Sequence, residues 1–247
     1  GDETVQTALT VGKPSAQVKY QGTSFTASKG YTSAYSLTFS GTYTDFVQGT
    51  SQLKLFNGNP GSGGTDITST YISGTTVSSS TAISFTLATG LNSGTYYVRV
   101  VTGSQTVDAT FTIKSISISS LTFNSSVVTG TNVPLGYSQM QVDVLGSNTL
   151  FQSSTTAVIK EVPDKTSLVT VTDSTHLSFT LASGLTAGTY TVKIDMDGNA
   201  ATTNDVVEKT FIVTTPSVSS VAPNNVVNSG TDFETVTVVG TDTHFTS

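Results

Sequence analysis

The chain has 247 residues, and only 11% of them are charged, where about 25% is usual in globular proteins. Ten Lys and Arg against 16 Asp and Glu give a net charge of −6, which excludes the basic stripe that nucleic-acid binding needs. Hydroxyls replace the missing charge, with 35 Ser and 48 Thr, yet 64 residues are Leu, Ile, Val or Phe, a share above that of disordered chains.

The first stretch of chain, residues 9–114, is predicted to form short β-strands joined by turns. Apolar and polar residues alternate at Tyr35–Ser40 and again within Thr81–Val98, and a period of two places successive side chains on opposite faces of a strand. The Gly-rich segment Asn57–Gly64 between them is predicted to be a loop. Because no segment keeps the 3.6-residue period of a helix, we expect an all-β fold.

The next stretch repeats the first. Thr81–Val98 recurs 94 residues later as Thr175–Val192, and 11 of the 15 residues from Ser84 to Val98 are identical to their counterparts. Such self-similarity predicts repeated structural modules. About seven short strands in about 100 residues, each with one apolar face, predict a sandwich of two packed sheets. We therefore predict module 1 at residues 1–114, with an N-terminal extension at 1–8, and module 2 at residues 115–214.

A third module is predicted to begin at residue 215. The pattern Gly-[Ser/Thr]-x-Thr-x-Phe follows a strand in both modules, at Gly41–Phe46 and Gly146–Phe151, and it returns at Gly240–Phe245. Residues 215–247 hold about two strands, which cannot cover an apolar face by themselves. Three explanations stay open: an arbitrary or proteolytic chain end, continuation into further modules, or completion by a strand of another chain, such as residues 4–11.

The start of the third module resembles the IPT/TIG type of immunoglobulin-like domain. The residues that carry the resemblance are the Pro-flanked strand Pro216–Pro223, the strand Val236–Gly240 and Phe245. The second module resembles it less closely and has Phe123 in place of Pro223. The resemblance implies tandem immunoglobulin-like β-sandwich modules, and tandem modules of this type imply bacterial surface proteins: adhesins, S-layer components or spacers attached to enzymes. Short linkers predict an elongated array with little slack.

Two histidines, His176 and His244, are the first residues to consider for catalysis. A Ser-His-Asp system needs a positioned base, and no Gly-x-Ser-x-Gly motif accompanies either histidine. The chain also has no Cys, which excludes thiol catalysis, disulfides and Cys-ligated zinc. The sequence therefore predicts a protein that is not an enzyme.

One group of carboxylates and amides is a candidate for calcium. Asp195, Asp197 and Asn199 alternate along one segment, and Asn204 and Asp205 follow across the same predicted hairpin. Calcium takes several hard oxygen ligands on flexible loops, and such side chains supply them. The EF-hand pattern is not met, and the Asp-Gly pair within the segment is equally typical of a plain turn. No other cofactor is predicted.

Four tyrosines of module 1, Tyr31, Tyr35, Tyr43 and Tyr71, are candidates for a surface that stacks on sugar rings. The alternative is that they are core residues, and the chain has no Trp, the residue that sugar-binding platforms usually use. Two further tyrosines follow Gly-Thr and are predicted to be structural, like the tyrosine near the start of strand F in immunoglobulin sandwiches: Tyr96 and Tyr190.

These observations predict a non-enzymatic, extracellular structural or adhesive protein of a bacterial cell surface, such as an S-layer protein, an adhesin stalk or a filament subunit. Its expected partner is a second copy, a surface or matrix protein, or a glycan. The alternative is a carbohydrate-binding or accessory module of a secreted enzyme that degrades polysaccharides. No apolar run reaches the about 18 residues that a membrane-spanning helix needs.

Overall fold

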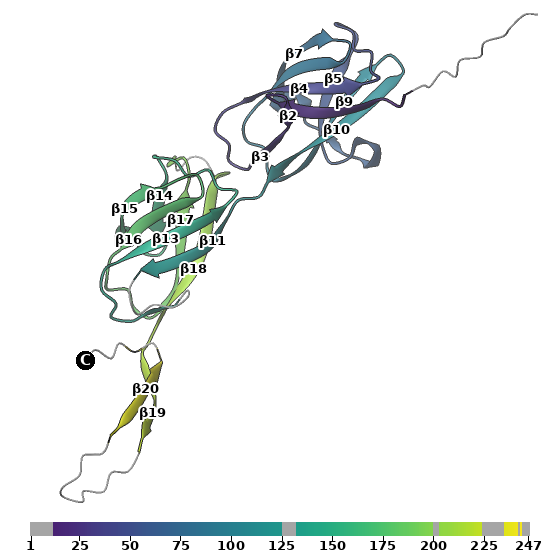
Figure 1. Cartoon of the computed structure of the whole chain (residues 1–247). Helices are drawn as coiled ribbons and strands as arrows, with labels where there is room; N and C mark the ends of the chain where they lie inside the picture. The colour runs from purple at the N-terminus through teal and green to yellow at the C-terminus, as the bar shows by residue number, and fades with distance from the viewer. Residues whose placement is uncertain (1–11, 125–131, 200–202, 224–234, 242, 244–247) are drawn as a thin grey trace, which may run out of the picture. The chain divides into compact units, whose positions relative to one another are not determined.

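The computed structural model describes residues 12–124, 132–199, 203–223, 235–241 and 243. The chain divides into two compact units after Ser115 (Figure 1). Each unit contains a pair of β-sheets with the apolar side chains between them. The predicted all-β fold of tandem sandwiches is therefore confirmed.

In the first unit the described residues form one sheet in the order β2-β1-β4-β8-β7 and a second in the order β3-β10-β9-β5-β6. The strands are β1 (Ser15–Tyr20), β2 (Thr23–Ser24), β3 (Thr26–Ser28), β4 (Tyr35–Thr42), β5 (Gln52–Asn57), β6 (Thr65–Asp66), β7 (Ile72–Ser79), β8 (Ala82–Leu87), β9 (Gly94–Thr102) and β10 (Gln105–Lys114).

In the second unit the corresponding sheets have the orders β11-β13-β16-β15 and β12-β18-β17-β14, and a separate pair, β19-β20, follows. The strands are β11 (Ser117–Asn124), β12 (Asn132–Pro134), β13 (Met140–Ser147), β14 (Thr156–Ile159), β15 (Thr166–Val171), β16 (His176–Leu181), β17 (Gly188–Asp195), β18 (Val206–Thr214), β19 (Ser217–Ala222) and β20 (Thr237–Thr241).

The strand order identifies both sandwiches as immunoglobulin-like. Read in chain order, β11-β13-β16-β15 corresponds to strands A, B, E and D, and β14, β17 and β18 correspond to C, F and G. The first unit has the same arrangement in β1-β4-β8-β7 and β5-β9-β10. In each unit one further short strand, β3 or β12, pairs in parallel with the last strand.

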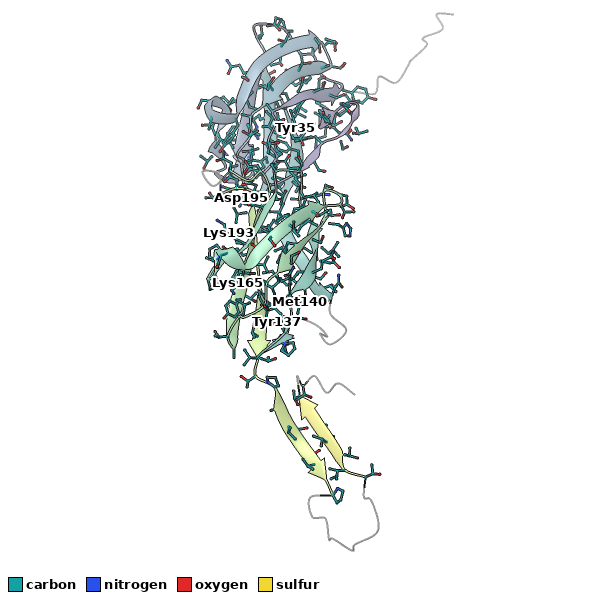
Figure 2. The ribbon with its side chains drawn as sticks, turned by 90° about the vertical axis from the view of Figure 1, so that its left-hand side faces the viewer. Tyr35, Tyr137, Met140, Lys165, Lys193 and Asp195 are labelled. Carbon is teal, nitrogen blue, oxygen red and sulfur yellow. The ribbon has the colours of Figure 1, made fainter. Side chains whose placement is uncertain are left out.

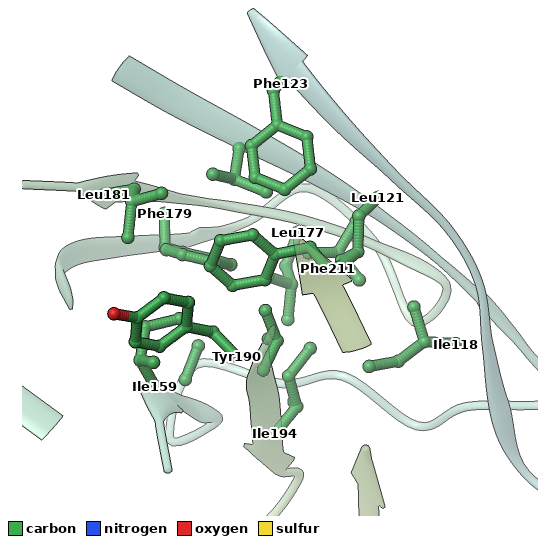
Figure 3. Close-up of a cluster of buried hydrophobic side chains, with 14 of the residues drawn as sticks. Ile118, Leu121, Phe123, Ile159, Leu177, Phe179, Leu181, Tyr190, Ile194 and Phe211 are labelled. Carbon is green, nitrogen blue, oxygen red and sulfur yellow. The ribbon is translucent and has the colours of Figure 1, made fainter. Parts of the chain in front are cut away.

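The core of each module consists of the inward-facing side chains of these alternating strands. Along β16 the burial alternates residue by residue, with Leu177, Phe179 and Leu181 buried. The partner sheet contributes Tyr190 and Phe211 to the same cluster, and Figure 3 shows these rings between the two sheets. The outward positions carry mostly Ser and Thr, so the hydroxyl-rich composition lies on the wet faces of the sheets.

The repeated Gly-[Ser/Thr]-x-Thr-x-Phe pattern is a structural corner. In module 2 the Gly146 amide donates to Thr175 O at 2.7 Å and the Phe151 amide donates to Ser174 O at 3.0 Å. The Thr149 hydroxyl donates to the same Ser174 oxygen at 3.0 Å, and a Cβ at position 146 would overlap the Thr149 side chain. Module 1 makes the same bonds with Gly41, Thr44, Phe46, Ser80 and Thr81.

The predicted loop at Asn57–Gly64 contains local structure. The 3₁₀ helix η1 (Pro60–Ser62) begins after Asn59, whose side chain accepts a hydrogen bond from the Gly61 amide at 2.8 Å. The short helix α1 (Thr68–Tyr71) follows, and Asp66 accepts from the Thr68 amide at 3.0 Å. In module 2 the 3₁₀ helix η2 (Pro163–Lys165) lies between β14 and β15. Helices of a single turn are too short to show a helical period in the sequence, so the periodicity analysis did not predict them.

The β19-β20 pair carries the exposed apolar side chains of the third segment. Val218 is 56% exposed, Val221, Val238 and Val239 are exposed as well, and so is Val236 just before β20. The predicted donor strand 4–11 and His244 lie outside the described residues. Across the described part of the chain, no helix has the length and apolarity to cross a membrane.

Candidate functional site

The strongest candidate site lies at the β17–β18 turn of module 2. Strand β17 ends at Asp195, which is 7% exposed, and Asp205, which is 2% exposed, directly precedes β18. Figure 2 shows Asp195 at one end of the module and Tyr137 at the other. Asp195 pairs with Thr156, at the end of the β13–β14 loop, and Ser147, at the start of that loop, pairs with Ser117 at the beginning of β11. The turn therefore lies at the end at which the chain enters the module.

Three carboxylates meet at this turn. Asp195, Asp197 and Asp205 each offer one oxygen, and these oxygens all lie within 4.8 Å of one another. The Asp197 amide donates to Asp205 Oδ2 at 3.0 Å, and the Gly198 amide donates to Asp195 Oδ1 at 3.0 Å. The backbone of the turn therefore holds the carboxylates in place.

The electrostatics of the group are unfavourable without a counter-charge. Burial raises the pKa of Asp195 above its usual value, and the hydrogen bond with Asp197 and the charge of Asp205 raise it further. Asp205 Oδ1 is buried and has no hydrogen-bond partner among the described residues. A buried carboxylate oxygen without a hydrogen-bond partner is costly.

Neighbouring segments anchor the turn to the core. The buried Thr155 hydroxyl donates to Met196 O at 2.7 Å, and the Leu150 amide contacts Met196 Sδ at 3.1 Å. Gly198 has a φ of 71°, and a Cβ at this position would overlap the carbonyl oxygen of Ser154. The turn therefore requires glycine for its conformation and for the close approach of the β13–β14 loop.

The structure adds one carboxylate to the predicted ligand set. It brings Asp195 and Asp197 together, as the alternating pattern suggested, and it adds Asp205 from the other side of the hairpin. Asn199 is exposed, and its amide donates to Asp197 Oδ1 at 2.7 Å, which is a turn-forming role. The sequence signal for Asp205 was its place across the predicted hairpin.

The four candidate tyrosines of module 1 do not form one surface. Tyr31 is 5% exposed, and its hydroxyl donates to Ala88 O at 2.5 Å, so it is a core residue with no ring face free for a sugar. Tyr35 is half-buried against Tyr31, with ring centroids 5.2 Å apart. Tyr71 is half-buried as well, whereas Tyr43 is 67% exposed beyond the opposite end of β4.

Tyr31 has a structural counterpart in module 2. Tyr137 also follows a glycine, is buried, and donates to Ala182 O at 2.6 Å, and burial raises its pKa to about 12. The repeated Gly-Tyr pair was the sequence signal for this structural role. The predicted corner tyrosines donate to the carbonyl four residues upstream, Tyr96 to Asn92 at 2.9 Å and Tyr190 to Thr186 at 3.1 Å.

His176 lies on the exposed face of module 2. Its Nδ1 is 2.9 Å from Asp173 Oδ2, and both side chains are more than half exposed. The Thr175 amide and the contact with His176 lower the pKa of Asp173 well below its usual value. This pair borders a hollow of about 570 Å³ on the outer face of the β11-β13-β16-β15 sheet, lined by Ser120, Thr122, Gln141, Asp143, Val144, Leu145, Thr172, Asp173, His176, Leu177 and Ser178.

No protein-family model matches the chain, and no curated protein matches it. Solved structures of similar fold include the I9–I11 tandem of titin, with 17% identity, 79% of this chain and 64% of that chain covered, and a TM-score of 0.43. Domains 4 and 5 of the S-layer protein SbsC share 15% identity over 81% of this chain and 96% of that one, with a TM-score of 0.32. The Escherichia coli adhesin FdeC shares 15% identity over 90% and 71%, with a TM-score of 0.28. The fold of this chain, a tandem of immunoglobulin-like β-sandwiches, is identified by its own strand order.

Proposed function

We propose that this chain is a non-enzymatic structural or adhesive protein of a bacterial surface, located outside the cell, and that its modules bear tension along the chain. The observation that carries the proposal is the parallel pairing of the last strand of each module with a strand near the module's beginning. Adhesion and surface assembly both place a chain under load between an anchor and a contact.

In module 1, Thr26–Ser28 of β3 pairs with Thr112–Lys114 of β10, and the Lys29 amide donates to Lys114 O at 2.9 Å. Once β1 has separated from β4, tension pulls β3 from its N-terminal end and β10 from its C-terminal end. Since the two strands are parallel, tension slides them in opposite directions and loads their hydrogen bonds together. Several bonds loaded together resist more force than bonds broken one by one.

Module 2 repeats this arrangement. Asn132–Pro134 of β12 pairs with Ile212–Thr214 of β18, and the Leu135 amide donates to Thr214 O at 2.7 Å. Only two residues separate β10 from β11, and only two separate β18 from β19. Ile116 in the first of these linkers packs against the core of module 2. Short linkers transmit load with little slack.

The outer surfaces favour contacts that do not depend on charge. Strand β10 buries alternate apolar residues and exposes Thr, Asp and Lys at the others, as its burial alternation requires. The proposed partners are a second copy of the chain, a surface or matrix protein, or a glycan. Each can hydrogen-bond to a hydroxyl-rich face, and none requires the strong electrostatic complementarity of an ionic partner.

Single-molecule force spectroscopy tests the proposal. Held by its two ends, the full chain is expected to show two force peaks, each releasing about 30 nm, because an extended residue spans about 3.4 Å. Leu135→Pro removes the amide that donates a hydrogen bond to Thr214 O. Leu135 directly precedes Gly136, whose φ is 84°, and this turn position accepts proline. We expect this variant to lower the force of one peak only.

Lys29→Pro is the matched variant, because Lys29 precedes Gly30 in the same kind of turn and donates to the last strand of module 1. It is expected to lower the other peak and leave the first unchanged. A chain that extends without force peaks, or peaks that neither proline alters, contradicts a load-bearing role.

A second candidate function is carbohydrate binding, and the hollow on the outer face of module 2 favours it. Its lining groups Gln141, Asp143 and His176 are donors and acceptors for sugar hydroxyls, and its volume lies in the range of about 300–1,000 Å³ typical of ligand sites. A glycan array and a pull-down on insoluble polysaccharide test it. Binding that Gln141→Ala or His176→Ala abolishes, while Tyr43→Ala leaves it unchanged, supports this function, and the absence of any binding contradicts it.

A further inference from the structure

We propose that Asp195, Asp197 and Asp205 bind one calcium ion, which stabilises the end of module 2 where the chain enters. The three carboxylate oxygens come from both sides of the β17–β18 hairpin and lie within 4.8 Å of one another. Ca²⁺ holds its oxygen ligands at about 2.3–2.6 Å, so two ligands of one ion lie no more than about 5 Å apart, and the three carboxylate oxygens meet this condition.

The unpartnered oxygen of Asp205 is the independent sign of a ligand. The Asp205 side chain is buried, with only 2% of its surface exposed, and its Oδ2 already accepts a hydrogen bond from the Asp197 amide. Its Oδ1 has no partner within the described ranges. A buried carboxylate normally has its oxygens satisfied by donors or by a metal, and a bound cation supplies what Oδ1 lacks.

The charge of the group points to a divalent cation. Within the described part of the chain, neither Asp195 nor Asp205 forms an ion pair with Lys, Arg or His, although both are buried. Like charges at this spacing disfavour one another, and a divalent ion reverses the sign of that interaction. Water and backbone carbonyls complete the shell in calcium sites, so three protein carboxylates are a sufficient acidic set.

The anchoring of the turn favours calcium over magnesium. Magnesium holds its ligands at about 2.0–2.1 Å in strict octahedral geometry, so its ligands must move into that geometry when it binds. The turn is anchored by the Thr155 hydroxyl on Met196 O and by the close approach at Gly198, so it resists contraction around a smaller ion. Calcium accepts oxygens in flexible, irregular geometry, so it suits carboxylates that the turn holds in place.

Module 1 provides an internal control. The equivalent turn between β9 and β10 contains Gly103 and Ser104, and Thr102 and Gln105 flank it, so it holds no carboxylate. The site therefore belongs to module 2 alone. A chain that binds calcium should respond in module 2 and not in module 1, which separates a specific site from a general effect of the ion.

Calorimetric titration of the full chain tests the site. After treatment with EDTA and dialysis into 150 mM NaCl, CaCl₂ is expected to bind with a stoichiometry of one, and MgCl₂ at least about tenfold more weakly. At about a hundredfold excess over Kd, calcium should raise the Tm of module 2 by roughly 10 °C. No binding up to millimolar calcium, or equal affinity for magnesium, overturns the proposal.

The variants Asp195→Asn and Asp205→Asn separate a calcium site from a purely structural turn. Each keeps an oxygen acceptor and removes one negative charge, so we expect each to abolish the calcium response while leaving the Tm in EDTA unchanged or higher. Asp164→Asn removes one exposed charge from the same module and should retain full calcium affinity. A variant at 195 or 205 that binds calcium like the parent chain overturns the assignment.

Hydrogen–deuterium exchange locates the effect even if one variant folds poorly. Calcium should slow exchange in peptides from β14 and β17 and leave peptides from β9 and β10 unchanged. Equal protection of both modules, or none, contradicts the site. These readouts are independent of the force peaks, so failure of the calcium site and failure of the load-bearing role are distinguishable.

Discussion

Replacing Phe211 by Ala is expected to destabilise module 2 by about 3–5 kcal/mol, the usual cost of emptying a large buried aromatic position. Phe211 is 1% exposed and packs its ring 5.3 Å from Phe123 and 5.7 Å from Tyr190. The substitution removes apolar burial and two aromatic pairs at once, in a core that joins the two sheets. Because domains have only about 5–15 kcal/mol of stability, this loss brings module 2 close to unfolding.

Urea unfolding with limited proteolysis and mass spectrometry measures the free energy of unfolding of each module. Phe111→Ala is the matched variant, since Phe111 packs 5.5 Å from Tyr96 and 5.3 Å from Phe25 in module 1. Each variant should shift the unfolding of its own module. Phe211→Leu should cost clearly less, because it keeps most of the buried volume. A shift below about 1 kcal/mol for Phe211→Ala is incompatible with a ring packed this closely.

Gly146→Ala is expected to cost module 2 about 3 kcal/mol, although the change adds a single methyl group. That methyl group would overlap the side chain of Thr149, so the threonine side chain cannot remain in place. Displacing Thr149 breaks its hydrogen bond to Ser174 O and leaves a buried hydroxyl without a partner. Both overpacking and the lost hydrogen bond contribute to the cost.

A double-mutant cycle tests this mechanism. Thr149→Ala removes the hydroxyl and methyl groups that the new Cβ would meet, so the double variant Gly146→Ala/Thr149→Ala should be less destabilised than the sum of the single variants. Gly41→Ala with Thr44→Ala is the same cycle in module 1. Additive effects at both corners show that the glycine is retained for another reason.

Local patterns predicted much of this structure correctly because they depend on neighbouring residues. The alternation in Thr81–Val98 and its repeat at Thr175–Val192 predicted strands β8, β9, β16 and β17, since a period of two is a property of the extended backbone. Tyr96 and Tyr190 were predicted to be structural, and both donate to the carbonyl four residues upstream.

Contacts between distant residues were harder to predict. The sequence around Tyr31 does not distinguish a ligand-binding tyrosine from a core tyrosine. Its hydrogen bond to Ala88, 57 residues away, identifies it as a core residue. The short strands β3 and β12 show no alternation long enough to recognise. Their parallel pairing joins residues that lie far apart in the sequence, such as Thr26 with Thr112 and Asn132 with Ile212.

By itself, the sequence determined an all-β chain of repeated modules, with apolar residues alternating against Ser and Thr, because strand periodicity and turn residues act over a few positions. It also determined which segment supplies carboxylates. The tertiary structure decided which of them meet: β17 and β18 pair along their length, so their ends bring Asp205 to Asp195 and Asp197. Burial then determined that Asp205 retains an unpartnered oxygen, since exclusion of water depends on the whole packed module.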